Sequence, residues 1–151
     1  MAWLNRWLRR AGSPAPDFDL ADLAGRRHDL GTLLEGRSAV LIDFFYLACA
    51  PCMAAFPVLE RLAAAHAGHG LGVVAISRGD TPDALRRFAE EQARHTLVLG
   101  AAADDPVFLA YRVFAYPTTC LIDSTRRIAH RGSGGDAAAW DAAVARLGIG
   151  P

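Results

Sequence analysis

The stretch DFFYLACAPCMAAFPVLERLAAAH, residues 43–66, contains two cysteines three positions apart, Cys49 and Cys52. Upstream it belongs to an apolar run, SAVLIDFFYL at residues 38–47, and a run so rich in β-branched and aromatic residues is typical of a strand buried on both faces. Downstream the apolar residues recur at intervals of three and four, which predicts a helix ending near His66. The cysteine pair is therefore expected where a central strand gives way to a helix.

The rest of the chain alternates between short apolar runs and segments with helical spacing. We expect further strands at residues 18–20, 28–30, 70–77, 96–101, 117–123 and 128–133. Further helices are expected at residues 31–36, 82–94 and 136–148, and a short helix is expected to begin at Pro106 within the segment 104–114. Prolines at the first position of two of these helices, Pro82 and Pro106, follow the capping residues Thr81 and Asp105, which is a helix-start signal. Alternating strands and helices that end in a hairpin predict an α/β fold with a central mixed sheet flanked by helices.

Length and composition fit a single globular domain. The chain has 151 residues, of which 52% are hydrophobic and 21% charged, and this length suits one core. The formal net charge is zero, so no basic field attracts nucleic acid and we expect no such partner. No apolar run approaches the ~20 residues of a membrane-spanning helix.

The first 13 residues are expected to form an amphipathic segment, and residues 14–151 the domain. Trp3 and Trp7 fall on one helical face and the arginines on others. We expect this segment to lie on the domain's own surface; the alternatives are a membrane-surface contact through the two tryptophans and a longer anchor removed upstream. No export signal is visible, which predicts the cytoplasm for the sequence as given, whereas a truncated N-terminus would predict a periplasmic or membrane-anchored protein.

A cysteine at a helix start is chemically activated. The first amides of a helix have no intrahelical acceptor, and the helix dipole adds partial positive charge, so a thiolate pKa there can fall from about 8.5 to roughly 3.5–7. We expect Cys49, at an exposed tip, to be the nucleophile and Cys52, one turn in and better covered, to resolve the mixed disulfide. Only two residues, Ala50 and Pro51, separate the cysteines, and a spacer this short lets the two sulfurs bond.

Two other interpretations of the cysteine pair compete with a redox role. The pair could be two small hydrophobic residues without chemistry, or half of a zinc site. Zinc usually takes four ligands, and the five histidines show no paired ligand spacing, so we expect no metal.

Two segments together resemble a known family. APDFDLADLAGRRHDLGTLLEGRSAVLIDFFYLACAPCMAAFP at residues 15–57 and YPTTCLID at residues 116–123 are similar to the thioredoxin-like thiol–disulfide oxidoreductases of the TlpA/ResA (AhpC/TSA-redoxin) group. The resemblance covers about residues 14–147. It implies a thioredoxin fold with an N-terminal β-hairpin extension and an enzyme that exchanges electrons with protein disulfides through Cys49 and Cys52, without a bound cofactor.

The resemblance also assigns roles to single residues. Cys49 and Cys52 match the active-site cysteines, and Ala50 and Pro51 lie between them where a substrate would contact the site. Pro117 matches the cis-proline that faces the disulfide in this fold, which implies that the preceding residue, Tyr116, meets an extended partner peptide.

Asp43, six residues before Cys49, matches the buried aspartate of thioredoxins. Burial raises a carboxyl pKa, so this side chain is expected to exchange a proton with Cys52.

The sequence also departs from the family. Ala48 stands where a tryptophan usually precedes the first cysteine, Ala55 replaces a frequent glutamate, and the basic partner that thioredoxins place near the aspartate is absent from VVAIS at residues 73–77. Cys120 stands where an aromatic residue is common, and its apolar neighbours predict a buried core thiol.

Two further functions remain as alternatives. A peroxiredoxin-like thiol peroxidase is suggested by FFY at residues 44–46 and the placement of Cys52, although Cys49 stands where that family has threonine. A metal-binding chaperone module would hold copper or zinc on Cys49 and Cys52 with a histidine. For the oxidoreductase we expect a protein disulfide or dithiol as substrate, an upstream electron donor and a monomeric chain.

Overall fold

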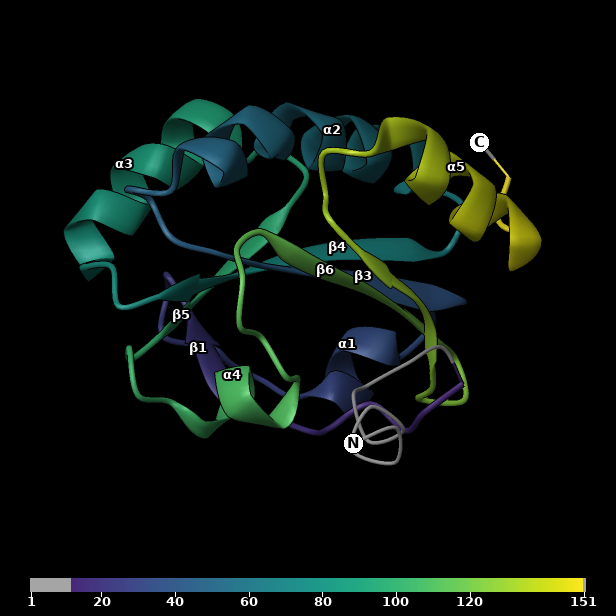
Figure 1. Cartoon of the computed structure of the whole chain (residues 1–151), viewed down its shortest axis with the longest axis horizontal. Helices are drawn as coiled ribbons and strands as arrows, with labels where there is room; N and C mark the ends of the chain where they lie inside the picture. The colour runs from purple at the N-terminus through teal and green to yellow at the C-terminus, as the bar shows by residue number, and fades with distance from the viewer. Residues whose placement is uncertain (1–11, 151) are drawn as a thin grey trace.

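The computed structural model describes residues 12–150, so the expectations for Trp3 and Trp7 lie outside the described residues. The chain folds as a layered α/β domain around one sheet (Figure 1). The strands are β1 Leu20–Asp22, β2 Arg27–His28, β3 Ala39–Phe45, β4 Leu71–Arg78, β5 Leu97–Ala101, β6 Thr118–Asp123 and β7 Ile128–Gly132. The helices are α1 Leu30–Leu34, α2 Ala50–His66, α3 Pro82–Gln92, α4 Pro106–Ala110 and α5 Ala137–Arg146.

The sheet is mixed, as the sequence predicts. Its strand order is β2-β1-β5-β4-β3-β6-β7. The central strands β3, β4 and β5 are parallel, whereas β6 runs antiparallel to β3 and pairs with β7 in the closing hairpin. The β1–β2 hairpin joins the far side of the sheet through antiparallel pairing of β1 with β5. This arrangement is the thioredoxin fold with an N-terminal hairpin extension.

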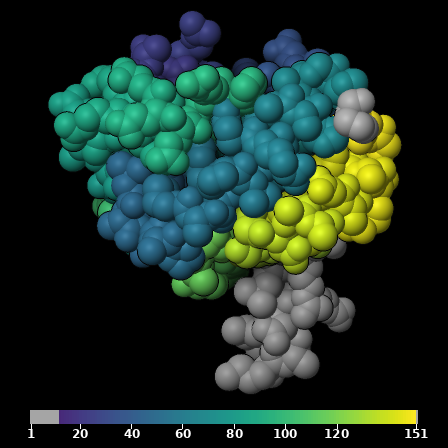
Figure 2. All heavy atoms as spheres, turned by 90° about the horizontal axis from the view of Figure 1, so that it is seen from above, coloured from purple at the N-terminus to yellow at the C-terminus, as the bar shows by residue number. Residues whose placement is uncertain are grey.

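Helices cover both faces of the sheet. Helices α2, α3 and α5 lie on one face, and α1 and α4 on the other (Figure 1). Seen from above, α3, α2 and α5 form one continuous helical surface (Figure 2). Strand β3 is buried along its whole length, and its side chains alternate between the two cores: Leu41 and Phe45 pack on the side of α2, whereas Ile42 and Phe44 pack on the side of α1 and α4. Asp43 therefore shares the α2 side with Leu41 and Phe45.

The N-terminal hairpin is displaced from its expected position. The sequence predicts strands at residues 18–20 and 28–30, but β1 spans Leu20–Asp22 and β2 only Arg27–His28. The second strand stops early because Asp29 caps α1: the Thr32 amide donates to Asp29 Oδ1 at 2.7 Å, and the Thr32 hydroxyl accepts from the Asp29 amide at 3.1 Å. The expected helix at residues 82–94 also ends earlier, at Gln92.

Between residues 12 and 150, no helix combines the length and apolarity that crossing a bilayer requires.

Candidate active site

The two cysteines meet at the start of α2. Strand β3 ends at Phe45, a short connection follows, and Cys49 is the N-cap of α2. The sulfurs of Cys49 and Cys52 form a disulfide, with their Cα atoms 5.2 Å apart, and the Cys52 amide lies 3.2 Å from Cys49 Sγ. An amide directed at this sulfur favours a thiolate once the bond is reduced. The structure thus confirms the predicted strand–helix junction and the proximity of the two sulfurs.

The expected exposure of Cys49 is wrong in this disulfide form. Only 4% of Cys49 and 1% of Cys52 is accessible to solvent. Both cysteines belong to the core cluster between the sheet and α2, and the partly buried Tyr46 and Tyr116 pack against that cluster. Cys52 is still the better covered of the two residues, as the sequence predicts. The exposed residues are the small ones around it, Ala48 and Ala50, together with Pro51.

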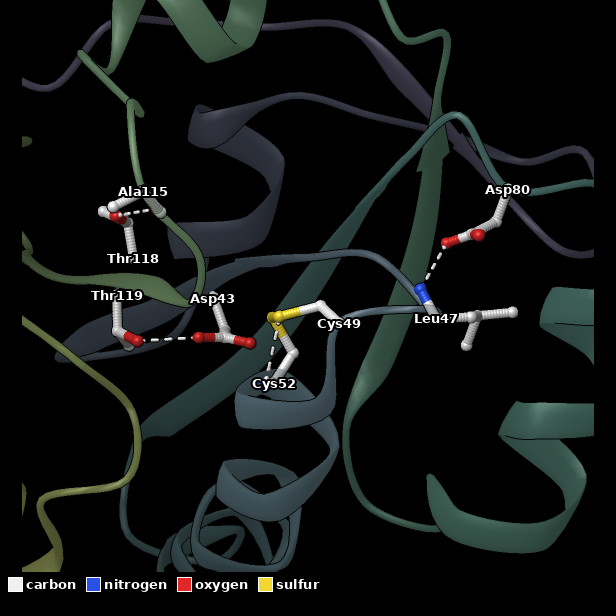
Figure 3. Close-up of a disulfide and its surroundings, with 8 residues drawn as sticks. All are labelled: Asp43, Leu47, Cys49, Cys52, Asp80, Ala115, Thr118 and Thr119. Carbon is white, nitrogen blue, oxygen red and sulfur yellow. Dashed lines mark hydrogen bonds between the residues drawn. A yellow bond between two sulfur atoms is a disulfide. The ribbon is translucent and has the colours of Figure 1, made fainter.

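Asp43 is fully buried beneath the disulfide. Its register partner on the neighbouring strand β6 is Thr119, whose hydroxyl donates to Asp43 Oδ1 at 2.6 Å. Figure 3 shows the Asp43 carboxyl between Thr119 on one side and the two sulfurs on the other. Burial raises the pKa of Asp43 to about 7, and the Thr119 hydrogen bond opposes that rise. A carboxyl with this pKa can hold or release a proton near neutral pH.

A second aspartate holds the loop that carries the cysteines. Asp80, just after β4, accepts a hydrogen bond on Oδ2 from the Leu47 amide at 2.9 Å (Figure 3). The same oxygen accepts from the buried Ser77 hydroxyl at 2.6 Å. The Leu47 amide lies two residues before Cys49. Asp80 therefore ties the β3–α2 connection to the end of β4.

The peptide bond between Tyr116 and Pro117 is cis, as predicted from the resemblance. Tyr116 packs edge-on against Tyr46, with ring centroids 5.3 Å apart, and the Arg78 guanidinium lies over its ring at 5.9 Å. Burial raises the pKa of the Tyr116 phenol, and the Arg78 charge opposes that rise. These contacts place Tyr116 beside the loop that carries the cysteines.

A hollow of about 310 Å³ lies next to Tyr116 and is lined by Arg78, Phe108, Leu109 and Phe114, among others. Leu109 and Phe114 are the two large hydrophobic side chains most exposed in the described part of the chain, at 64% and 67%. The backbone beneath them is held from β7, because the Arg131 guanidinium donates to the Tyr111 and Arg112 carbonyls at 2.6 Å each.

Cys120 is a core thiol, as predicted. It is fully buried and unbonded to another cysteine, and burial raises its thiol pKa to about 11, against the opposing influence of Arg131. A thiol with this pKa carries almost no thiolate at neutral pH. In the chain from residue 12 to 150, no three His, Cys, Asp or Glu side chains are grouped as a metal site would require.

Four residues around the site escape prediction from the sequence. Three are described above, Thr119, Asp80 and Arg131, and the fourth is Gly134, where a Cβ atom would lie 3.2 Å from Asp43 Oδ1. The contact of Thr119 with Asp43 depends on how β6 pairs with β3. Asp80 lies 33 residues along the chain from Leu47, whose amide it accepts. The one available signal is the YPTTCLID segment, which contains Thr119 among the residues that carry the family resemblance.

Fold and site together define a thioredoxin-like protein with a dithiol–disulfide centre at a helix start. The AhpC/TSA family model matches residues 11–131. The chain belongs to the AhpC/TSA family, and within it its sequence is similar to proteins of the ResA type.

Individual proteins agree with this placement. The thiol-disulfide oxidoreductase ResA of Geobacillus thermodenitrificans is 35% identical over 119 residues, which cover 78% of this chain. The matched segment spans 66% of that relative, just under two thirds of its length.

Solved structures share the fold. A Chlorobium tepidum protein assigned as the thiol:disulfide interchange protein DsbE superposes with a TM-score of 0.80 at 24% identity, covering 91% of this chain and 96% of its own. The peroxidoxin BcpB of Mycobacterium tuberculosis superposes with a TM-score of 0.75 at 25% identity and the same two coverages, 91% and 96%. The fold alone therefore does not separate disulfide exchange from peroxide reduction.

Proposed function

We propose that this protein is a thiol–disulfide oxidoreductase that exchanges electrons with protein disulfides through Cys49 and Cys52. The observation that carries the proposal is the disulfide between the N-cap and the third residue of α2, placed over a buried carboxyl with a pKa of about 7. The similarity to proteins named thiol-disulfide oxidoreductase supports it.

In the reducing direction, the Cys49 thiolate attacks one sulfur of a substrate disulfide. A bond forms between Cys49 Sγ and that sulfur, the substrate S–S bond breaks, and its electron pair leaves with the other substrate sulfur. Cys52 then attacks Cys49 Sγ, which releases the second substrate sulfur as a thiolate. The protein is left with the Cys49–Cys52 disulfide seen here, and the substrate has gained two electrons.

Asp43 handles the proton of the second step. Cys52 must lose its thiol proton to become a nucleophile, and the ionised Asp43 carboxylate is the buried base that Figure 3 places beside it. In the opposite direction the neutral Asp43 carboxyl returns that proton to Cys52 as the disulfide opens. A pKa near 7 lets the same group serve both directions.

Substrate contact is proposed at the exposed rim of the disulfide. Ala50 and Pro51 have no bulky side chains and are exposed, so a partner backbone can approach Cys49 between them and Tyr116. The partners are a protein disulfide or dithiol and a separate electron donor, and the chain acts as a monomer. A redox pair can work in either compartment, so the cellular location stays a prediction from the sequence.

The test is thiol-driven reduction of insulin disulfides by the purified protein. Wild type is expected to accelerate the reaction, Cys49→Ser to abolish the acceleration, and Cys52→Ser to accumulate a mixed disulfide on Cys49. Cys120→Ala serves as the matched cysteine control and should retain activity. Failure of wild type to reduce insulin, combined with rapid peroxide consumption lost in Cys52→Ser alone, would establish the peroxidase in its place.

A further inference from the structure

The two oxygens of the Asp43 carboxyl have different surroundings. Oδ1 accepts the Thr119 hydroxyl hydrogen at 2.6 Å. Oδ2 is buried and, among the side chains of residues 12–150, is the buried polar atom that lacks a hydrogen-bond partner. Figure 3 shows Oδ1 turned toward Thr119 and the other oxygen turned toward the cysteines. Buried polar atoms are nearly always hydrogen-bonded, so an unpartnered oxygen directed at a reactive pair calls for a chemical explanation.

Thr119 is held in place by the sheet itself. Asp43 of β3 and Thr119 of β6 are register partners in an antiparallel pair, and directly opposed side chains on one face of such a pair lie within contact distance. Both residues are fully buried.

Gly134, in the connection between β7 and α5, closes over the Asp43–Thr119 pair. A Cβ atom at this position would lie 3.0 Å from Thr119 Oγ1 and 3.2 Å from Asp43 Oδ1. The approach of this glycine leaves no room for a side chain above the hydrogen bond, so the hydroxyl and the carboxyl stay paired.

A hydroxyl has one hydrogen to donate, and here that hydrogen is directed at Oδ1. A neutral carboxyl carries its proton on one oxygen only. With that proton on Oδ1, Thr119 would have to turn and accept, which would leave its own hydrogen unpaired in a buried place. With the proton on Oδ2, Thr119 keeps its donation and the carboxyl hydrogen faces the sulfurs.

We propose that Thr119 is a positioning residue that keeps the exchangeable proton of Asp43 on Oδ2, the oxygen that faces Cys49 and Cys52. The inference rests on the proposed function, because it assigns the atom that serves the proton step of disulfide exchange. When an external thiolate attacks Cys49 Sγ, the Cys49–Cys52 bond breaks and its electron pair goes to Cys52 Sγ. The proton on Asp43 Oδ2 passes to that sulfur, which leaves a Cys52 thiol and an Asp43 carboxylate paired to Thr119.

Few ionisable groups surround Asp43. Figure 3 shows the Cys49–Cys52 disulfide beside its carboxyl, and the two cysteines do not titrate while that bond is intact. A titratable group that interacts with Asp43 is the Cys120 thiol of β6, whose pKa the Asp43 charge raises. On β4 its register partner is Ala75, and Gly134 covers it from the β7–α5 connection. Within the described residues, no charged side chain contributes to the raised pKa of Asp43, so a change at Thr119 can be interpreted without a second charge effect.

The first test is a carbon-13 NMR titration of the Asp43 carboxyl in the oxidised protein, with Asp43→Asn used for assignment. The Thr119 hydrogen bond favours the charged carboxylate, so Thr119→Val should raise the Asp43 pKa, which corresponds to about a 10-fold tighter hold on the proton. Thr119→Ser keeps the hydroxyl, so the Asp43 pKa in this variant should stay close to the wild-type value. Thr96→Val is the matched control, since Thr96 is also buried and donates to a carboxylate, that of Glu60, at 2.8 Å.

The second test is the pH dependence of disulfide reduction by dithiothreitol, corrected for its thiolate fraction. The wild-type rate should fall above the Asp43 pKa because the proton donor is lost. In Thr119→Val the inflection should move upward with the pKa. The rate at its plateau should fall about 10-fold, which is a part of the roughly 10²–10⁴-fold that a positioned proton donor contributes in full. Thr119→Ser should restore both features, and Thr96→Val should leave both unchanged.

Opposite results separate the two proposals. A Thr119→Val profile identical to wild type, or a Thr119→Ser protein as impaired as Thr119→Val, overturns the role of the hydroxyl while leaving disulfide exchange intact. Wild-type protein whose disulfide dithiothreitol does not reduce, with the NMR change still present, overturns the proposed function and with it the catalytic use of the Asp43 proton.

Discussion

Replacing Asp43 by asparagine should change how stability depends on pH. Burial raises the pKa of the folded-state carboxyl to about 7 from an ordinary 3.8. The folded protein binds the Asp43 proton more tightly than the unfolded chain does, so the contribution of Asp43 is fully present below about pH 4 and is lost as the pH rises through 7. Since a tenfold difference in proton affinity between the two states is worth about 1.4 kcal/mol, the raised pKa predicts a loss of about 4 kcal/mol in the free energy of unfolding.

Asparagine removes this titration while keeping an oxygen for Thr119. Its amide group leaves buried hydrogens without a partner, a penalty of about 1–3 kcal/mol that does not depend on pH. Asp43→Asn should therefore be less stable than wild type at about pH 4.5 and more stable at about pH 8.5, so the two stability curves cross between these values.

The effect is measured by urea unfolding of the oxidised wild-type and Asp43→Asn proteins between about pH 4.5 and 8.5. The other carboxylates contribute the same pH dependence to both proteins, so it cancels in the difference between their free energies of unfolding. Asp141→Asn is the control, since Asp141 is an exposed residue of α5 paired with Arg61 at 3.3 Å. A constant difference between wild type and Asp43→Asn across the whole pH range would refute the raised pKa, and with it the proton role of this carboxyl.

Three other perturbations probe contacts around the site. Asp80→Ala leaves the Leu47 amide without its acceptor, so it should lower stability by about 1–3 kcal/mol and speed alkylation of Cys49 in the reduced protein. Gly134→Ala forces a methyl group against Thr119 Oγ1 at 3.0 Å and should cost about 1–3 kcal/mol by overpacking, measured by urea unfolding. Cys120 should resist iodoacetamide in the native protein, by mass spectrometry, because its thiol is buried and its pKa is about 11.

Control variants and a labelling control test the physical reasons given for these three results. Asp83→Ala removes an exposed aspartate of α3 and should leave Cys49 alkylation unchanged. Gly68→Ala adds a methyl group that meets nothing within 4 Å, so a loss as large as that of Gly134→Ala would show that overpacking is not the cause. Labelling of native Cys120 at the rate of an unfolded control would contradict its burial.

The sequence predicts the site where the chemistry is local. Cys49 and Cys52 are separated by two residues, so their meeting at a helix start follows from the strand and helix patterns on either side. Strand alternation also places Asp43 on the face of Leu41 and Phe45, against α2, whereas the proton role proposed for it comes from the resemblance to thioredoxins.

Contacts between distant segments could not be predicted in the same way. The Thr119–Asp43 bond depends on how β6 registers against β3, and sequence periodicity within each strand does not determine that register. Cys49 is buried as part of a core cluster against which Tyr46 and Tyr116 pack from two different connections, and the sequence pattern does not reveal that packing. The displaced β1–β2 hairpin reflects competition between strand pairing and the Asp29 cap of α1, which the strand pattern alone does not reveal.

Arg131 has a consequence for how the exposed surface beside Tyr116 can change. Its guanidinium fixes the chain at Tyr111 and Arg112, and the Thr118 hydroxyl closes the other end by donating to the Ala115 carbonyl at 2.6 Å. The exposed Phe114 thus lies on a short segment whose two ends are both held by hydrogen bonds. Its side chain can therefore be exchanged for one of different size or polarity without moving the backbone that carries Tyr116, so the exposed surface beside the disulfide can change while the disulfide itself stays in place.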